Sequence, residues 1–411
     1  MYLNNEEEMM LKGKYGEATR LAMEILVDLG VAYNANKMIK VESANIVCGS
    51  YRLTYDAGVE ICEKLAEEGA SVRIPTSIVT GASPLDHWTE FGVPDSWADK
   101  QLRLARALEK IGAIPIWTCT PYYHINVPRF GQQIAWAESN CVIYANSVIG
   151  ARTNRYASYV DLCAAIVGLV PEFGLHLAEN RRGNVLVNVK GFKQLSDEDY
   201  PLLGYRIGED VIKGIPVIQG IPKSVKNSQL VSFGAAMASS GAAALYHVVG
   251  VTPEARTLQE AFGEEEPEDK LELGPEDLKD TKEKLSTIIG GCDIDFVNIG
   301  CPHSTISEIG ELAALLKGEK VHDGVKFWVS TNRIVNALAE KMGYASILRE
   351  SGVKIMTDSC CLTIPTYLCG FKTMVTNSAK MAHYSPMSCK TNVIYASTSE
   401  CIKAAITGRV E

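Results

Sequence analysis

Three cysteines occupy positions at which parallel-sheet proteins often bind ligands. Cys119, Cys301 and Cys360 each follow a short apolar run, and each is followed by a proline within five residues. Such runs indicate buried strands, and open α/β sheets bind ligands at the carboxyl ends of their strands. Three thiolates with an open fourth position suit an iron–sulfur cluster whose exposed iron is a Lewis acid. The spacing alone also allows each cysteine to be a small buried hydrophobic residue.

A polar cluster between residues 138 and 155 could also do chemistry. It begins with Glu138 and Ser139 and ends with Arg152 and Arg155, which lie among threonine, asparagine and glycine residues. Arginine binds carboxylates and phosphates through paired hydrogen bonds, so an anion site is one interpretation. A solvated loop with helix caps is the other interpretation.

Strands and helices must alternate to place these residues. The chain alternates short apolar runs with amphipathic stretches, which predicts an α/β fold. We expect one or more N-terminal lobes over 1–256, which carry Cys119, and an acidic surface segment over 257–287. A C-terminal α/β lobe over 288–411 would carry Cys301 and Cys360.

Composition excludes several classes of protein. The chain has 411 residues, 46% hydrophobic and 22% charged, with a net charge of −9. Without a basic patch, we expect no nucleic-acid partner and no membrane partner. No signal peptide and no bilayer-spanning run is evident, and twelve cysteines then indicate a reducing cytoplasm. The absence of a GxGxxG or P-loop motif argues against a nicotinamide dehydrogenase or an NTPase.

Several motifs occur together in one order. They are Thr118-Cys119-Thr120-Pro121-Tyr122, Glu138-Ser139-Asn140, Gly150-Ala151-Arg152-Thr153-Asn154-Arg155, Gly300-Cys301-Pro302-His303, Thr357-Asp358-Ser359-Cys360 and Asn377-Ser378-Ala379-Lys380. In this order, over nearly the whole length, the chain resembles the catalytic subunit of the aconitase X family. The resemblance implies an aconitase-like, multi-lobed, three-layer α/β fold with parallel sheets.

The resemblance also implies an iron–sulfur cluster held by three cysteines. The ligands would be Cys119, Cys301 and Cys360, around a [4Fe-4S] cluster that becomes [3Fe-4S] if the exposed iron is lost. Cys361 competes for the third position, but Cys360 occupies the cysteine of the family's Thr-Asp-Ser/Thr-Cys motif. We expect His303 to form a hydrogen bond that supports the ligands.

The family's substrate contacts transfer to eight residues here. Glu138, Ser139 and Lys380 would be catalytic as well as substrate-binding. The other contacts implied by the resemblance are Cys48, Gly49, Ser50, Thr76 and Ser77, and Arg152 and Arg155 are added as candidate cations for the substrate's carboxylate or phosphate. Two of these stretches depart from the family pattern. Cys48 and Gly49 stand in a turn that is usually richer in glycine, and Ser77-Ile78 replaces a common Asn-Pro pair.

The resemblance is closest to two-subunit members that dehydrate (R)-mevalonate 5-phosphate to trans-anhydromevalonate 5-phosphate in the archaeal modified mevalonate pathway. It implies a hydro-lyase whose small, swivelling partner subunit supplies a catalytic serine. One alternative is a cis-3-hydroxy-L-proline dehydratase, which needs no phosphate site. The other, from a different class, is a non-catalytic iron–sulfur or scaffold subunit.

Overall fold

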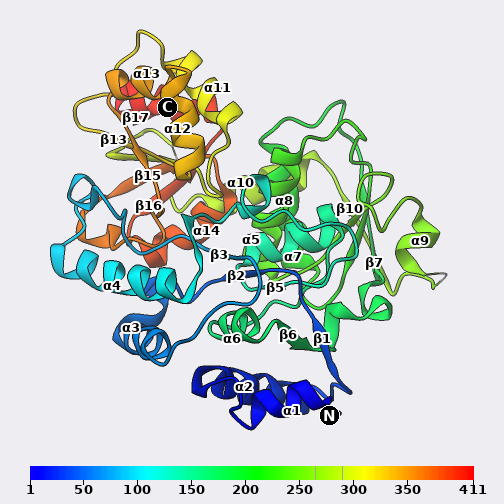
Figure 1. Ribbon diagram of the computed structural model, residues 1–411. Helices are drawn as coiled ribbons and strands as arrows, with labels where there is room; N and C mark the ends of the chain where they lie inside the picture. The colour runs from blue at the N-terminus through cyan, green and yellow to red at the C-terminus, as the bar shows by residue number, and fades with distance from the viewer. Residues whose placement is uncertain (264, 289) are drawn as a thin grey trace.

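Three parallel β-sheets, each from a different third of the chain, organise the computed structural model (Figure 1). The structure describes residues 1–263, 265–288 and 290–411. Glu264, in the predicted acidic segment, and Ile289, in the predicted C-terminal lobe, lie outside the described residues. In Figure 1 the first unit lies at the bottom, the second at the right and the third at the upper left. The predicted α/β class with parallel sheets is confirmed.

The first unit is a four-stranded sheet in the order β4-β3-β2-β5. Its strands are β2 (Ala44–Ile46), β3 (Thr76–Ile78), β4 (Ile114–Trp117) and β5 (Ala135–Trp136), with an antiparallel pair, β1 (Met38–Lys40) and β6 (Leu169–Pro171). Its helices are α1 (Asn5–Leu11), α2 (Glu17–Ala32), α3 (Tyr51–Glu67), α4 (Asp95–Ile111), α5 (Ser139–Tyr144) and α6 (Val160–Val167). Helix α4 has an apolar stripe that includes Leu104, Leu108 and Ile111, and this stripe is buried against the sheet.

The second unit has the parallel order β10-β7-β8-β9. Its elements are β7 (Val185–Val189), α7 (Asp199–Asp210), β8 (Pro216–Gln219), α8 (Asn227–Gly241), β9 (His247–Val248), α9 (Leu258–Phe262), β10 (Asp269–Leu273) and α10 (Pro275–Leu285). Within the segment 257–287, β10 is a mostly exposed edge strand, whereas α9 and α10 bury apolar residues against the rest of the protein. The lobe division stays a prediction.

The third unit is a five-stranded parallel sheet in the order β14-β13-β12-β15-β16. Its strands are β12 (Phe296–Ile299), β13 (Lys326–Ser330), β14 (Val353–Met356), β15 (Thr373–Thr376) and β16 (Asn392–Tyr395), beside the antiparallel pair β11 (Cys292–Asp293) and β17 (Arg409–Val410). Its helices are α11 (Ile306–Leu316), α12 (Arg333–Lys341), α13 (Tyr344–Ser351), α14 (Ala379–Ser388) and α15 (Thr398–Thr407). Apolar residues of this sheet pack into two separate core clusters, so both of its faces are covered.

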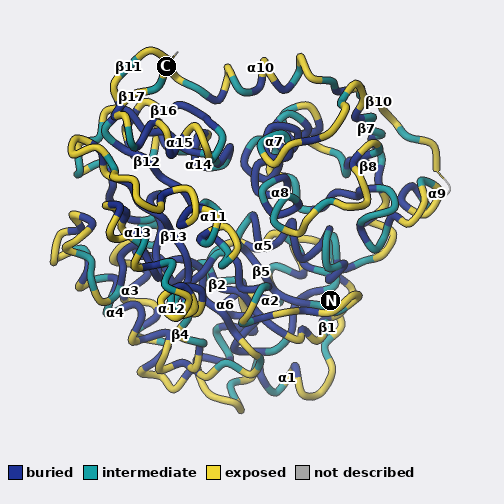
Figure 2. The backbone as a smooth tube through the Cα atoms, turned by 90° about the horizontal axis from the view of Figure 1, so that it is seen from above, coloured by how far each residue is buried: buried dark blue, intermediate teal, exposed yellow. Residues whose placement is uncertain are grey.

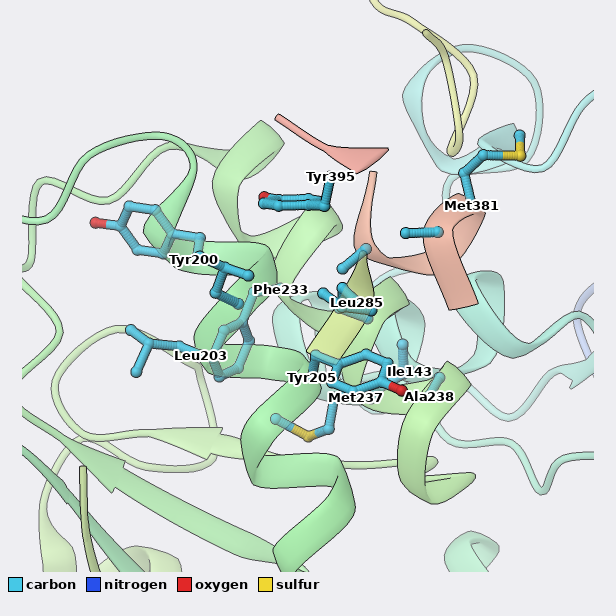
Figure 3. Close-up of a cluster of buried hydrophobic side chains, with 14 of the residues drawn as sticks. Ile143, Tyr200, Leu203, Tyr205, Phe233, Met237, Ala238, Leu285, Met381 and Tyr395 are labelled. Carbon is cyan, nitrogen blue, oxygen red and sulfur yellow. The ribbon is translucent and has the colours of Figure 1, made fainter. Parts of the chain in front are cut away.

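One apolar core joins the three units. Figure 3 shows buried side chains of α7 and α8 next to Ile143 from the first unit and to Met381 and Tyr395 from the third. Seen from above, the segments around β2 and β5 are mostly buried, whereas exposed stretches lie along the rim and also around α12 (Figure 2). Among the residues that the structure describes, no helix is both long enough and apolar enough to cross a bilayer.

Candidate active site

The candidate residues follow the carboxyl ends of strands in the first and third sheets. In the first unit, Cys119 follows β4, and Glu138 and Ser139 follow β5. In the third unit, Cys301, Cys360 and Lys380 follow β12, β14 and β15. Gly300 makes the first of these third-unit turns possible, because its φ is +98° and a Cβ there would lie 2.2 Å from the Ser330 carbonyl oxygen.

A buried ion pair connects the first and third units. The Nζ of Lys380 lies 2.6 Å from Oε1 of Glu138, and each side chain is 12% exposed. Lys380 Nζ also lies 3.4 Å from the hydroxyl of Ser139. Glu138 caps α5 by accepting a 2.8 Å hydrogen bond from the Cys141 amide. The structure thus brings together all three predicted catalytic residues.

Charge keeps both members of this pair ionised. Burial alone would raise the pKa of Glu138, but Lys380 lowers it overall. Burial alone would lower the pKa of Lys380, but Glu138, Cys301 and Cys119 raise it overall. The site therefore holds a permanent ammonium group at neutral pH.

Cys360 raises the pKa of both of the other predicted cysteine ligands. Burial raises the pKa of Cys119, with further increases from Glu138 and Cys360 and an opposing effect from Lys380. Burial likewise raises the pKa of Cys301 to about 12, and Lys380 opposes it while Cys360 adds to it. The thiols thus share one local field, and a nearby positive charge would be needed to hold them as thiolates.

His303 contacts all three cysteine loops. Its amide nitrogen lies 3.3 Å from Cys119 Sγ, its Nδ1 lies 3.1 Å from the Thr118 hydroxyl, and its Nε2 lies 3.0 Å from the Ser359 carbonyl oxygen. Burial lowers the pKa of His303 to about 4, so the ring is neutral. The hydrogen bond predicted for His303 is present, but its partners in the other two loops could not be read from the sequence.

Cys360 and Cys361 have different surroundings. Cys361 is fully buried in the apolar core, where its Sγ lies 3.7 Å from that of Cys389. Cys360 is 8% exposed, has its Sγ 3.5 Å from the Thr363 hydroxyl, and acts on the ionisation of Cys119 and Cys301. The side chains of Cys360 and Cys361 therefore lie in different environments, although the two residues are adjacent in sequence.

An arginine clamp holds the Cys360 loop. Arg333, the first residue of α12, binds both carboxylate oxygens of the fully buried Asp358 at 2.6 and 2.7 Å. It also lies 2.7 Å from Asp86 of the first unit. No role was predicted for Arg333 from the sequence. The signal was its position just after β13, next to the strand that leads to Asp358.

The predicted substrate turn 48–50 lies at the end of β2. Cys48 is fully buried, and a hydrogen bond with Cys62 together with burial raises its pKa. A Cβ on Gly49 would lie 2.5 Å from Ile78, so only glycine fits there. The hydroxyl of Ser50 is buried and has no hydrogen-bond partner among the described residues. Buried Asp161 fixes the turn by accepting a 2.7 Å hydrogen bond from the Val47 amide.

The remaining predicted substrate contacts form hydrogen bonds with residues outside the cysteine loops, except for one arginine nitrogen that has no partner among the described residues. Thr76 donates to the Ile74 carbonyl oxygen at 2.9 Å, and the Ser77 hydroxyl accepts from Asn45 and Asn126. In the described part of the chain, neither Arg152 nor Arg155 has a hydrogen bond or ion pair with the cysteines, Glu138 or Lys380. Arg155 binds the Ala242 carbonyl oxygen, and the buried Nε of Arg152 has no hydrogen-bond partner among the residues that the structure describes.

A pocket of about 490 Å³ opens beside Cys301. Its wall also includes Ser378 from the third unit, Lys226 and Asp197 from the second, and Tyr123 from the first. This volume lies within the range of ligand pockets. Of the third unit's predicted site residues, the pocket exposes Cys301 to solutes, whereas Cys360 and Lys380 do not line it.

The donor set fits an iron–sulfur cluster better than a single metal ion. No three His, Cys, Asp or Glu side chains within the described ranges are close enough to share one ion. A cluster binds its cysteines through different irons, so its sulfurs need not meet at one point. Three thiols that follow strands of two sheets, a peptide N–H directed at Cys119 Sγ and a buried ammonium provide ligands and charge for such a group.

Comparison with known proteins assigns the family. Models of the first, second and third domains of aconitase X match residues 1–179, 183–283 and 294–407. The large subunit of phosphomevalonate dehydratase from Methanocaldococcus jannaschii is 40% identical over 409 residues, covering 98% of this chain and 100% of that protein. That from Thermococcus kodakarensis is 40% identical over 389 residues, covering 93% and 95%.

Two further relatives extend the comparison. Cis-3-hydroxy-L-proline dehydratase from Pseudomonas aeruginosa is 39% identical over 406 residues, covering 98% of this chain and 70% of that protein. The crystal structure of Thermococcus kodakaraensis aconitase X in its holo-form superposes with a TM-score of 0.89 at 37% identity, covering 98% of this chain and all of that one. The chain therefore belongs to the aconitase X family, as its ordered motifs predicted.

Proposed function

We propose that this chain is the large, catalytic subunit of a phosphomevalonate dehydratase, a hydro-lyase acting on (R)-mevalonate 5-phosphate. The observation that carries the proposal is the buried Lys380–Glu138 pair beside Cys119 and Cys301, at the strand ends of two sheets. The names of relatives that are 38–40% identical over nearly the whole chain support the same reaction. The product would be trans-anhydromevalonate 5-phosphate.

In this proposal Cys119, Cys301 and Cys360 hold an iron–sulfur cluster of the [4Fe-4S] type, with [3Fe-4S] as the form left after iron loss. When bound, the cluster supplies an exposed iron that acts as a Lewis acid on a hydroxyl oxygen. The core position of Cys361, beside Cys389, supports Cys360 as the third ligand. The protein fixes where the substrate lies relative to that iron.

The residues of the chain would stabilise charge during dehydration. A proton leaves C2 and hydroxide leaves C3, and the C2–H electron pair forms the new double bond. The carboxylate next to C2 takes up negative charge as the proton leaves. Lys380 is cationic and buried, so it would bind that carboxylate and stabilise this charge. Glu138 holds the ammonium in place, and Ser139 offers a hydroxyl to the same substrate group.

The proton acceptor at C2 would be a serine of a small partner subunit with a swivelling domain. The large-subunit names of the relatives, which this chain matches over 90–100% of their length, support a separate small subunit. Ser50, whose buried hydroxyl lacks a hydrogen-bond partner within the described ranges, remains a proposed substrate contact. All twelve cysteines are free thiols, which supports work in a reducing cytoplasm.

The second candidate is a cis-3-hydroxy-L-proline dehydratase. The 39% identity to the Pseudomonas aeruginosa enzyme favours it. Both reactions remove water from a β-hydroxy acid, so the same lysine and cysteines would serve either. The substrates differ in the phosphate of one and the ring ammonium of the other, which makes them separable by experiment.

The test is anaerobic turnover by this chain mixed with its small subunit. We expect dehydration of mevalonate 5-phosphate only when both chains are present, and none of hydroxyproline. Turnover of hydroxyproline alone would establish the second candidate. A protein with no iron, no sulfide and no turnover would favour the non-catalytic scaffold.

Paired variants test the ligand assignment. Cys360→Ser should abolish iron binding and turnover, whereas Cys361→Ser, the matched control one residue away, should retain both. The reverse pattern would assign the third ligand to Cys361.

A further inference from the structure

We infer that His303 is a positioning residue that holds the three cysteine loops at the spacing an iron–sulfur cluster requires. This inference rests on the proposed function, because it concerns the same cluster. It gives His303 no contact with substrate and no proton transfer. Its role is to hold the loops of Cys119 and Cys360 to its own loop, which carries Cys301, through hydrogen bonds with Thr118, Cys119 and Ser359.

The bonding pattern fixes the tautomer of the His303 ring. The Ser359 carbonyl oxygen can only accept, so Nε2 carries the hydrogen and donates across 3.0 Å. Nδ1 then accepts from the hydroxyl of Thr118 at 3.1 Å. The Thr118 oxygen in turn accepts from the Thr120 amide at 3.1 Å. Each partner has one consistent role, so the ring joins two loops without an unsatisfied atom.

The backbone of His303 provides the third connection. Its peptide nitrogen donates to Cys119 Sγ at 3.3 Å, and Cys301 lies two residues before it on the same loop. His303 is therefore bonded to Thr118, to the sulfur of Cys119 and to Ser359, which precedes Cys360. It also lies in the loop that carries Cys301. Hydrogen bonds to cluster sulfurs and to ligand loops tune how firmly a metal centre is held.

Loss of the ring would release two loops. The Ser359 carbonyl oxygen and the Thr118 hydroxyl are in buried residues and would lose a partner. Because Ser359 adjoins Cys360 and Thr118 adjoins Cys119, the freed loops could shift the sulfurs apart. The predicted consequence is faster loss of iron, with the rest of the fold retained.

Two substitutions and one control test this role. His303→Leu removes both ring bonds, whereas His303→Gln places an amide N–H near the position of Nε2 and restores the bond to Ser359. His247→Leu is the matched control, because His247 is 1% exposed and its Nε2 lies 2.7 Å from the Arg181 carbonyl oxygen, in the second unit. It removes a bond of the same kind away from the cysteines.

The measurement is the rate at which a ferrous-iron chelator removes iron from the anaerobically purified, cluster-loaded chain. Visible absorption and electron paramagnetic resonance of the cluster, and circular dichroism for the fold, are recorded alongside it. We expect His303→Leu to lose iron about 10-fold faster than wild type or more. His303→Gln should fall between the two, and His247→Leu should match wild type even if it melts at a lower temperature.

Three results would overturn the inference. Unchanged iron loss in folded His303→Leu would show that the ring does not position the loops. Equal acceleration in His303→Leu and His247→Leu would show only general destabilisation. Wild-type protein that holds neither iron nor sulfide would overturn the proposed cofactor together with this inference, so the two failures are distinguishable.

Discussion

Replacement of Lys380 by methionine should leave a buried carboxylate without its cation. The Lys380 Nζ to Glu138 Oε1 distance is 2.6 Å, and both side chains are 12% exposed. Coulomb's law at an effective dielectric constant of about 20 gives roughly 6 kcal/mol for charges at that distance, before desolvation. Loss of one partner of a buried pair costs about 3–5 kcal/mol. Because Glu138 keeps its hydrogen bond from the Cys141 amide, we expect Lys380→Met to lower the free energy of unfolding by about 3 kcal/mol.

A double-mutant cycle in the metal-free chain measures this coupling. The free energy of unfolding is determined by urea denaturation for wild type, Lys380→Met, Glu138→Gln and the double variant. We expect the double variant to be more stable than Lys380→Met, because its buried amide carries no charge. Additive effects, within about 0.5 kcal/mol, would refute the coupling between the two charges.

The same variant should show a distinct dependence on pH. In wild type the pKa of Glu138 is lowered from 4.5, so the pair's contribution is present above that pH and is lost as the pH falls. In Lys380→Met the cation is absent, so burial raises the pKa of Glu138. The protonated carboxyl carries no charge, so burying it in that form destabilises the fold little. The stability deficit should therefore be small below about pH 4.5 and should grow as the pH rises.

Two further predictions concern buried aspartates. Arg333→Leu should destabilise the chain by about 2–3 kcal/mol in urea denaturation, because it leaves Asp358 buried and unpaired; Arg333 is itself 40% exposed, which reduces the figure. Asp86→Asn should lower the free energy of unfolding by less than about 1 kcal/mol, since Asp86 is exposed. Equal losses in Arg333→Leu and Asp86→Asn would contradict the clamp on Asp358. Burial raises the pKa of Asp161 from 3.8 to about 7, so the folded state takes up a proton and stability falls as pH rises from 3.8 to 7. Asp161→Asn should remove a slope worth about 4 kcal/mol over that window, and an unchanged melting profile against pH would refute it.

The local sequence pattern was enough to predict which residues follow the ends of strands. It was not enough to predict which residues of different units contact one another. Cys119 and Cys301 each follow an apolar run, so their place at the end of a strand could be predicted. The family resemblance placed Glu138 and Lys380, 242 positions apart, in one site, but their ion pair was not predicted. Arg333 and Asp358 are 25 positions apart, and only the adjacency of the strands that precede them could have indicated their contact.

The position of β3 differs from what its local sequence indicates. The alternation of residues 71–74 predicts a short strand there followed by a loop, but the strand spans Thr76–Ile78. The amides of Val72 and Arg73 instead bond the carbonyl oxygens of Ile111 and Ala165. Contacts with helices α4 and α6 thus decide the conformation of this segment, and its own sequence does not.

The separation of the cysteines along the chain has a consequence for biosynthesis. Cys360 is 241 positions after Cys119, and the contacts of Lys380 come later still. At a translation rate of about 5–20 residues per second, Cys119 is synthesised roughly 12 to 50 seconds before Cys360. A cluster held by the three proposed cysteine ligands would therefore form only after Cys360 has been synthesised.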